Sequence, residues 1–225
     1  MIAELGLQRS GEVVDLAAGT GKLTRALVPR FARVVAIEPD EEMRAFLAQN
    51  APTAETMAGR AEAMPLPDAS VDAVFVADAF HWFDTRVALD EIARVLRPRG
   101  ALAFLWNVWR ELEPRLPQHM LDRLWEIHAR AGRRTGPSYD AGPWCGEWRK
   151  AMATSQFEPL RAETLETDVH LSEDDVTSLY LTVSSVTALE EPERRELAES
   201  LRRSLSGRYR LRLRTDVYWT RLRSR

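Results

Sequence analysis

Apolar residues follow two different spacings along the first hundred positions. Continuous apolar runs, typical of strands buried on both faces of a parallel sheet, occur at residues 13–16, 34–37, 71–77 and 101–106, with a weaker run at 54–58. Helical spacing of apolar residues occurs at residues 22–28, at 87–96 and in a segment that Asp40 can cap. Strands and helices that alternate in this way predict a doubly wound α/β fold with a mostly parallel sheet.

The alternation breaks after Asn107. Residues 115–131, 144–152 and 172–205 have mostly helical patterns, whereas residues 161–170 alternate like a strand. A last strand is predicted near residues 209–219, with Tyr209, Leu211, Leu213, Val217 and Trp219 on one face and Arg208, Arg210, Arg212 and Arg214 on the other. We expect this half to complete the sheet and to add helices over its carboxyl edge, with the arginines on a solvated face.

Composition narrows the class of protein. The chain has 225 residues, enough for one α/β domain with an elaboration, and its net charge of −3 gives no bulk attraction for nucleic acid or an anionic membrane. Its single cysteine, Cys145, cannot close an intrachain disulfide. The sequence has neither a signal-peptide pattern nor an apolar stretch of the roughly 20 residues that cross a bilayer. We therefore expect a cytoplasmic monomer or homodimer with no nucleic-acid or membrane partner.

The first strand leads into a glycine-containing turn, Asp15-Leu16-Ala17-Ala18-Gly19-Thr20-Gly21, and then into a helix. Such a turn lets a ligand approach the backbone closely. A phosphate-binding P-loop is excluded, because Leu16 stands where its first glycine belongs and Leu23 where its hydroxyl belongs. A nicotinamide fingerprint is weak, because Thr24 replaces its third glycine.

The turn resembles the first motif of class I S-adenosylmethionine-dependent methyltransferases. Three further segments resemble this family in order and spacing: Gly59-Arg60-Ala61-Glu62-Ala63-Met64-Pro65-Leu66-Pro67, the strand with its loop at residues 71–83, and residues 91–100. The His81-Trp82-Phe83 variant and Asp216-Val217-Tyr218-Trp219 resemble a small-molecule branch, similar to the type 11 methyltransferases. The resemblance covers residues 12–107 and implies a seven-stranded Rossmann-like sheet with an antiparallel last strand and a C-terminal helical cover.

The resemblance also implies roles for individual residues. Asp15 would face the methionine end of the cofactor, Glu38 would accept both ribose hydroxyls at roughly 1.5–3 kcal/mol each, and Glu62 would accept from the adenine amino group. The full set of residues expected to bind S-adenosylmethionine is Asp15, Ala17, Ala18, Gly19, Gly21, Glu38, Pro39, Met43, Ala61, Glu62, Ala77 and Asp78. No metal is expected, because His119 and His128 fall on opposite faces of one helix.

Several interpretations stay open. His81 is the candidate general base, and it could equally bond the loop or the methionine carboxylate. Asp15 could satisfy loop amides, Glu38 could be an exposed charge, and Asp78 could cap the loop. The tryptophans Trp106, Trp109, Trp144 and Trp148 are weighed evenly between an apolar substrate pocket and the core.

The predicted reaction is transfer of the cofactor's methyl group to O, N or C of a small-molecule acceptor by in-line displacement, which yields S-adenosylhomocysteine. Residues 1–107 would form the cofactor-binding core, and residues 108–225 the rest of the same domain with substrate-covering helices. Family members usually carry an N-terminal arm over the cofactor, whereas 12 residues precede the first run here. The alternatives are therefore a non-catalytic or truncated S-adenosylmethionine-binding module and, less favoured, an NAD(P)-dependent oxidoreductase. The motif Asn/Asp-Pro-Pro-aromatic of enzymes that methylate base amino groups is absent after the fourth predicted strand.

Overall fold

The chain divides into two compact units. The structure is a computed structural model, and it describes residues 2, 4–131 and 147–224. One unit contains Met1–Trp106, Pro143–Thr164 and Asp216–Arg225, and the other contains Asn107–Gly142 and Leu165–Thr215. The predicted polar stretch at residues 132–143, and with it Trp144 and Cys145, lies outside the described residues.

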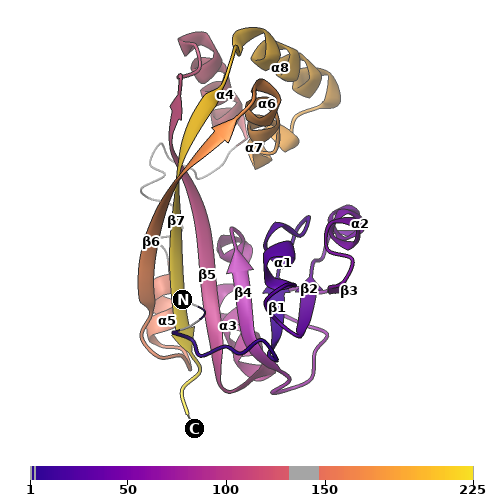
Figure 1. Cartoon of the computed structure of the whole chain (residues 1–225), viewed down its shortest axis with the longest axis vertical. Helices are drawn as coiled ribbons and strands as arrows, with labels where there is room; N and C mark the ends of the chain where they lie inside the picture. The colour runs from indigo at the N-terminus through magenta and orange to yellow at the C-terminus, as the bar shows by residue number, and fades with distance from the viewer. Residues whose placement is uncertain (1, 3, 132–146, 225) are drawn as a thin grey trace. The chain divides into compact units, whose positions relative to one another are not determined.

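The first unit alternates strands and helices as the apolar spacing predicts (Figure 1). Its elements are β1 (Glu12–Leu16), α1 (Lys22–Leu27), β2 (Arg33–Ile37), α2 (Glu41–Asn50), β3 (Glu55–Met57), β4 (Val71–Ala77), the 3-10 helix η1 (Phe80–Trp82), α3 (Thr85–Val95) and α5 (Glu147–Ala153). Asp40 caps α2 as expected, because its side chain accepts from Met43 N at 2.8 Å.

Seven strands form one sheet in the order β3-β2-β1-β4-β5-β7-β6, where β5 is Leu96–Glu113, β6 is Arg161–Leu171 and β7 is Tyr209–Arg221. The pairings from β3 to β5 are parallel. β7 runs antiparallel to β5, since Leu222 N donates to Gly100 O at 2.9 Å while Thr215 Oγ1 bonds Asn107 Oδ1 at 2.8 Å. The predicted doubly wound, mostly parallel sheet of seven strands with an antiparallel last strand is confirmed.

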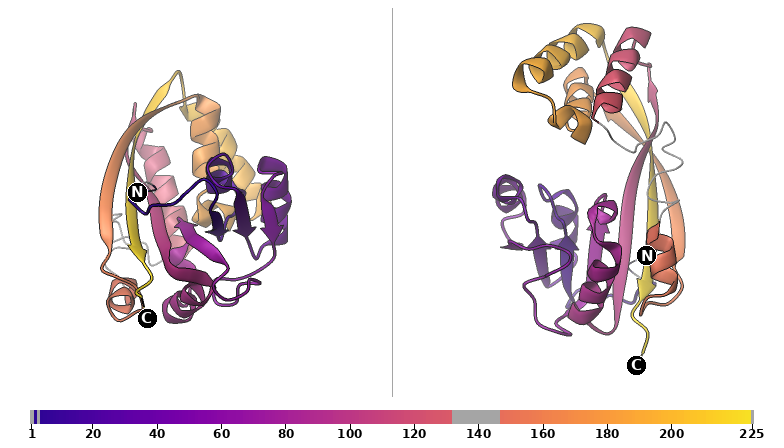
Figure 2. Two further views of the ribbon diagram at one scale, coloured as in Figure 1. Left: turned by 60° about the horizontal axis from the view of Figure 1, so that its bottom comes forward. Right: turned by 180° about the vertical axis from the view of Figure 1, so that it is seen from behind.

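The sheet is covered on both faces in the first unit. Along β1, β2 and β4, side chains alternate between two apolar clusters, so Val14 packs in one cluster and Val13 in the other. The first cluster includes Leu89 and Ile92 of α3, while the second includes Leu27 of α1. Figure 2 shows α3 and α5 side by side against the sheet. This layering explains why the central strands read as continuous apolar runs.

Strand β5 is longer than predicted. The apolar run was expected to end at residue 106, but the strand continues to Glu113. Beyond Trp106 the side chains alternate, with Asn107 exposed and Val108 buried. A half-buried strand of this kind is typical of antiparallel pairing, and its sequence contains no continuous apolar run.

In the described residues of the second unit, four helices surround a third apolar cluster that contains Leu124, Val176 and Leu201. These helices are α4 (Gln118–Arg130), α6 (Glu173–Leu181), α7 (Ser184–Thr187) and α8 (Glu191–Ser204) (Figure 1). Ser172 and Asp175 form a reciprocal capping box that starts α6. In the part of the chain that the structure describes, none of the helices has the length and apolar character needed to cross a bilayer.

The arginines of β7 form ion pairs with the neighbouring strands. Arg210 pairs with Glu113 of β5, and with Asp168 of β6 at 3.5 Å. Arg212 reaches the same aspartate at 3.6 Å and Glu111 at 4.0 Å. The side chains of Arg210 and Arg212 are about 40% exposed, so the arginine face is solvated as expected. These arginines also form ion pairs with acidic residues of the neighbouring strands.

Candidate functional site

Three central strands end at the same edge of the sheet. Leu16 of β1 is in register with Ile37 of β2 and with Val76 of β4. The residues that follow them are Ala17, Glu38 and Ala77. Neighbouring strands lie about 4.8 Å apart, so these predicted cofactor-binding residues are brought together at the carboxyl edge, where α/β sheets bind ligands.

The turn after β1 uses left-handed backbone conformations. Ala17, Gly19 and Gly21 have φ values of 56°, 55° and 86°. A Cβ on Gly21 would lie 2.7 Å from Leu47 Cδ1, so this glycine allows the turn to pack against α2. A Cβ on Gly19 would meet nothing within 4 Å. Gly19 therefore leaves open space beside the backbone, as a closely approaching ligand requires.

Glu38 is held in place by backbone amides. Its side chain is buried, its Oε2 accepts from Gly19 N at 2.8 Å, and its Oε1 accepts from Asp40 N at 3.0 Å. Each carboxylate oxygen has a second acceptor position, which a ligand hydroxyl can use. The burial excludes the interpretation of Glu38 as an exposed surface charge.

Asp15 lies deeper, 1% exposed within β1. A buried carboxyl needs a polar partner, and the structure supplies one, since Thr24 Oγ1 donates to Asp15 Oδ2 at 2.6 Å. Burial raises the pKa of Asp15 from 3.8 to about 7; the nearby Glu38 adds to the increase and the Thr24 hydrogen bonds oppose it. Burial therefore favours the protonated form of Asp15 well above the pH at which a free aspartate ionises.

The segment expected to border the adenine lies beside the end of β2. A Cβ on Gly59 would come within 2.9 Å of Ile37 Cγ2, and Ala61 is buried in the same cluster as that isoleucine. Glu62 is half-buried, and its Oε1 accepts from Asp84 N at 3.0 Å.

Side chains of helix α3 hold residues 64–68, at the end of the segment expected to border the adenine. Glu91 Oε1 accepts from Met64 N at 2.7 Å, and Arg94 donates to Leu66 O at 2.8 Å and to Asp68 at 2.6 Å. The bond to Arg94 lowers the pKa of Glu91, and Glu91 in turn raises the pKa of Arg94. Neither this pair nor the role of Thr24 was predicted from the sequence, although the spacing of three between Glu91 and Arg94 on a predicted helix indicates such a pair.

The loop after β4 carries the remaining polar candidates. Asp78 is exposed, has a φ of 50°, and donates its N–H to Leu105 O at 2.9 Å. Left-handed backbone at a residue other than glycine costs energy and is concentrated at ligand sites. His81 and Trp82 are exposed on η1 with ring centroids 5.0 Å apart.

Pro39 and Met43 complete the predicted set on the α2 side. Both are exposed, and Met43 is 46% accessible. Arg44 donates to Glu38 O at 2.8 Å and fixes the backbone between the strand and the helix. Apolar side chains open to solvent beside a buried carboxylate suit a ligand that has both an apolar ring and hydroxyl groups.

The structure places two of the four candidate tryptophans in the core. Trp106 and Trp148 are buried in the first cluster, with ring centroids 5.5 Å apart, so they belong to the core. Trp109 lines a pocket of the second unit. Among the residues with described positions, no group of three or more His, Cys, Asp and Glu side chains is arranged to hold a metal ion.

The acceptor groups at this edge are compatible with S-adenosylmethionine. The carboxylates of Glu38 and Glu62 suit a ligand with ribose hydroxyls and an amino group, and the open space at Gly19 suits close approach. A turn, a buried carboxylate and a strained loop at one sheet edge belong here to a Rossmann-like domain without a pyrophosphate-type fingerprint.

Part of the chain is similar to known methyltransferases. Residues 14–104 match the family described as "Methyltransferase domain". An uncharacterized methyltransferase of Mycobacterium tuberculosis is 53% identical over 95 residues, which are 42% of this chain and 39% of that protein. The malonyl-acyl-carrier-protein O-methyltransferase of Methylococcus capsulatus is 38% identical over 130 residues, 55% of this chain and 47% of that protein.

Solved structures with a similar fold cover nearly the full length of this chain. A structure from Anaeromyxobacter dehalogenans, provisionally described as a type II methyltransferase, has a TM-score of 0.62 at 25% identity and covers 100% of this chain and 96% of its own. Geranyl diphosphate C-methyltransferase of Streptomyces coelicolor, in complex with S-adenosyl-L-homocysteine, has a TM-score of 0.53 at 17% identity. The match covers 98% of this chain and 73% of that protein. Residues 14–104 are therefore similar to a methyltransferase domain, and the fold of the chain is that of solved methyltransferase structures. The matched segments span about half or less of the length of these two curated relatives.

Proposed function

We propose that the chain transfers a methyl group from S-adenosylmethionine to an O, N or C atom of a small molecule. The observation that carries the proposal is Glu38, a buried carboxylate oriented by Gly19 N and Asp40 N at the carboxyl edge of the sheet. The family match over residues 14–104 supports the same reaction class. S-adenosylmethionine supplies a methyl group on a sulfonium centre, which the acceptor takes by in-line displacement.

In this proposal the residues of the chain bind and orient the cofactor. Glu38 would accept the ribose hydroxyls, and Gly19 would allow close approach. Ala61 and Glu62 would border the adenine, with Pro39 and Met43 beside it. Asp15, Ala17, Ala18, Ala77 and Asp78 would line the methionine end, and Gly21 would keep the turn packed against α2.

His81 is the proposed proton acceptor. It lies on η1, three residues after Asp78, with an exposed ring. A general base increases a reaction rate roughly 10²–10⁴-fold. Positioning of the reactants also increases the rate, but it involves no proton transfer. Once an acceptor is known, a kcat loss of that size in His81→Gln with unchanged cofactor affinity would assign the base; a smaller loss would remove it from the proton-transfer step.

Cofactor binding is the first experiment. Calorimetric titration of the intact chain with S-adenosylmethionine should give saturable binding that Glu38→Ala weakens about tenfold or more, the value of one charged hydrogen bond. Glu42→Ala, an exposed glutamate on α2, is the matched control and should bind as the unmodified chain does. Absence of binding to the folded chain would refute the proposal.

A further inference from the structure

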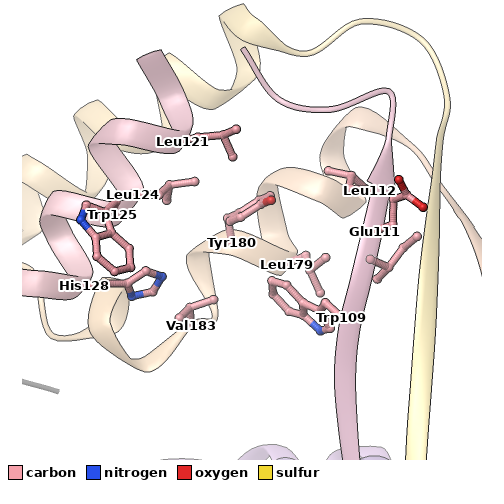
Figure 3. A pocket seen from close by; sticks show the side chains of 11 residues that line it. Trp109, Glu111, Leu112, Leu121, Leu124, Trp125, His128, Leu179, Tyr180 and Val183 are labelled. Atoms are coloured by element: carbon pink, nitrogen blue, oxygen red, sulfur yellow. The ribbon is translucent and has the colours of Figure 1, made fainter. Parts of the chain in front are cut away.

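The second unit contains a pocket of its own, with a volume of about 280 Å³. Its walls come from β5, α4, α6 and β7 together with the residues just after α6 (Figure 3). Eight of the eleven lining side chains are tryptophan, leucine or valine. None of the residues expected to bind the cofactor is among the eleven, so the pocket is a separate candidate site.

The walls of this pocket are preformed. Trp109 and Tyr180 meet edge to face, with ring centroids 5.8 Å apart and an interplanar angle of 82°. His128 is paired through its Nδ1 with the hydroxyl of Ser185, a buried residue. Figure 3 shows these rings, on different elements, facing a common space. Trp125 is 53% exposed, so this part of the lining is open to solvent.

The size and chemistry of the pocket define the ligand class. An apolar cavity of about 150 Å³ admits one benzene molecule, so the present volume suits a group of about two rings or an equally compact hydrocarbon. Glu111 is the one carboxylate among the lining side chains, and its charge is compensated by Arg115 at 3.6 Å and Arg212 at 4.0 Å, which are not lining residues. A neutral ligand is therefore favoured over an anion, which would meet no arginine or lysine among the lining residues.

We infer that this pocket binds a neutral aromatic or equally compact hydrocarbon group. The inference goes beyond the proposed function and does not depend on it, because all the lining residues lie in the second unit. A neutral ligand with an apolar body of about two rings is the corresponding class.

The test uses 2-naphthol, a neutral two-ring probe, in equilibrium dialysis with the intact chain. Leu179→Trp would fill the pocket and weaken binding by about tenfold or more. Leu165→Trp makes the same change at a 49% exposed leucine outside the pocket and should leave binding unchanged. Trp125→Ala removes an exposed ring at little cost in stability, and should weaken binding by about fivefold. The anion 2-naphthalenesulfonate should bind more weakly than 2-naphthol.

Failure of this inference can be told apart from failure of the proposed function. Saturable binding of 2-naphthol that Leu179→Trp and Trp125→Ala weaken, with S-adenosylmethionine affinity unchanged in both, supports the pocket. Absence of saturable binding, or equal loss in Leu165→Trp, overturns it, as does equal or tighter binding of the sulfonate. Binding of 2-naphthol without any binding of S-adenosylmethionine would support the pocket and refute the proposed function.

Discussion

Replacing Asp15 with asparagine should make the stability of the chain much less dependent on pH. Asp15 is 1% exposed, and burial raises the pKa of its carboxyl from 3.8 to about 7. The folded state therefore keeps a proton that the unfolded chain has lost between these two pH values. An asparagine side chain at this position has the same shape without a titrating group, and its amide oxygen can still accept from Thr24 Oγ1.

The sign and size of the expected change in stability follow from proton linkage. Because the folded state binds the extra proton, the free energy of unfolding falls as pH rises from about 4 to about 7, and the Asp15 contribution is constant above that range. Each pKa difference of one is worth about 1.4 kcal/mol, so the total is roughly 4 kcal/mol. Asp15→Asn should therefore gain stability over the unmodified chain as pH rises, by up to roughly that amount at pH 8.

Urea unfolding followed by tryptophan fluorescence, at several pH values between 4.5 and 8, measures this difference. Glu42→Gln, at an exposed position of α2, is the matched control and should give a difference that does not change with pH. A difference for Asp15→Asn that stays within about 1 kcal/mol across the range would refute the reasoning, because it would mean that the folded-state pKa of Asp15 is ordinary.

Three further changes test the turn and its support. Gly21→Ala should lower the free energy of unfolding by roughly 2 kcal/mol or more in urea titrations, because it combines a φ of 86° with a Cβ placed 2.7 Å from Leu47; a loss below about 0.5 kcal/mol would contradict this account. Gly19→Ala should cost only about 1 kcal/mol, from its φ of 55°, while cofactor affinity measured by calorimetry falls about tenfold; intact affinity would mean that no ligand approaches there. Arg94→Lys should lose about 1–2 kcal/mol of stability, since one ammonium cannot keep the bonds to Glu91, Asp68 and Leu66; unchanged thermal unfolding would show that the network contributes little.

The sequence predicted the first unit well because its strands are buried on both faces. Continuous apolar runs locate β1, β2 and β4, and a glycine turn, an acidic cap at Asp40 and prolines locate the helices between them. The last strand was also predictable, because its apolar and arginine positions alternate strictly. These signals are local, so a single sequence contains them.

What the sequence did not reveal depends on contacts between distant residues. The extension of β5 to Glu113 needs the antiparallel partner β7, which is about one hundred residues away in the chain. The Thr24 hydroxyl on Asp15 and the two amides on Glu38 follow from how the turn closes, and the residue types do not specify that closure. The pocket of the second unit combines Trp109, Trp125 and Tyr180 from three elements, so the residue types alone do not distinguish a pocket tryptophan from a core tryptophan.

The central claim is that the carboxyl edge around Glu38 binds S-adenosylmethionine. The most direct measurement is a calorimetric titration of the folded, intact chain with S-adenosylmethionine and with S-adenosylhomocysteine, beside Glu38→Ala and the control Glu42→Ala. Saturable binding of both compounds, weakened about tenfold or more by Glu38→Ala and unchanged by Glu42→Ala, is the predicted result. No binding to the folded chain, or equal affinity in Glu38→Ala, would contradict the account.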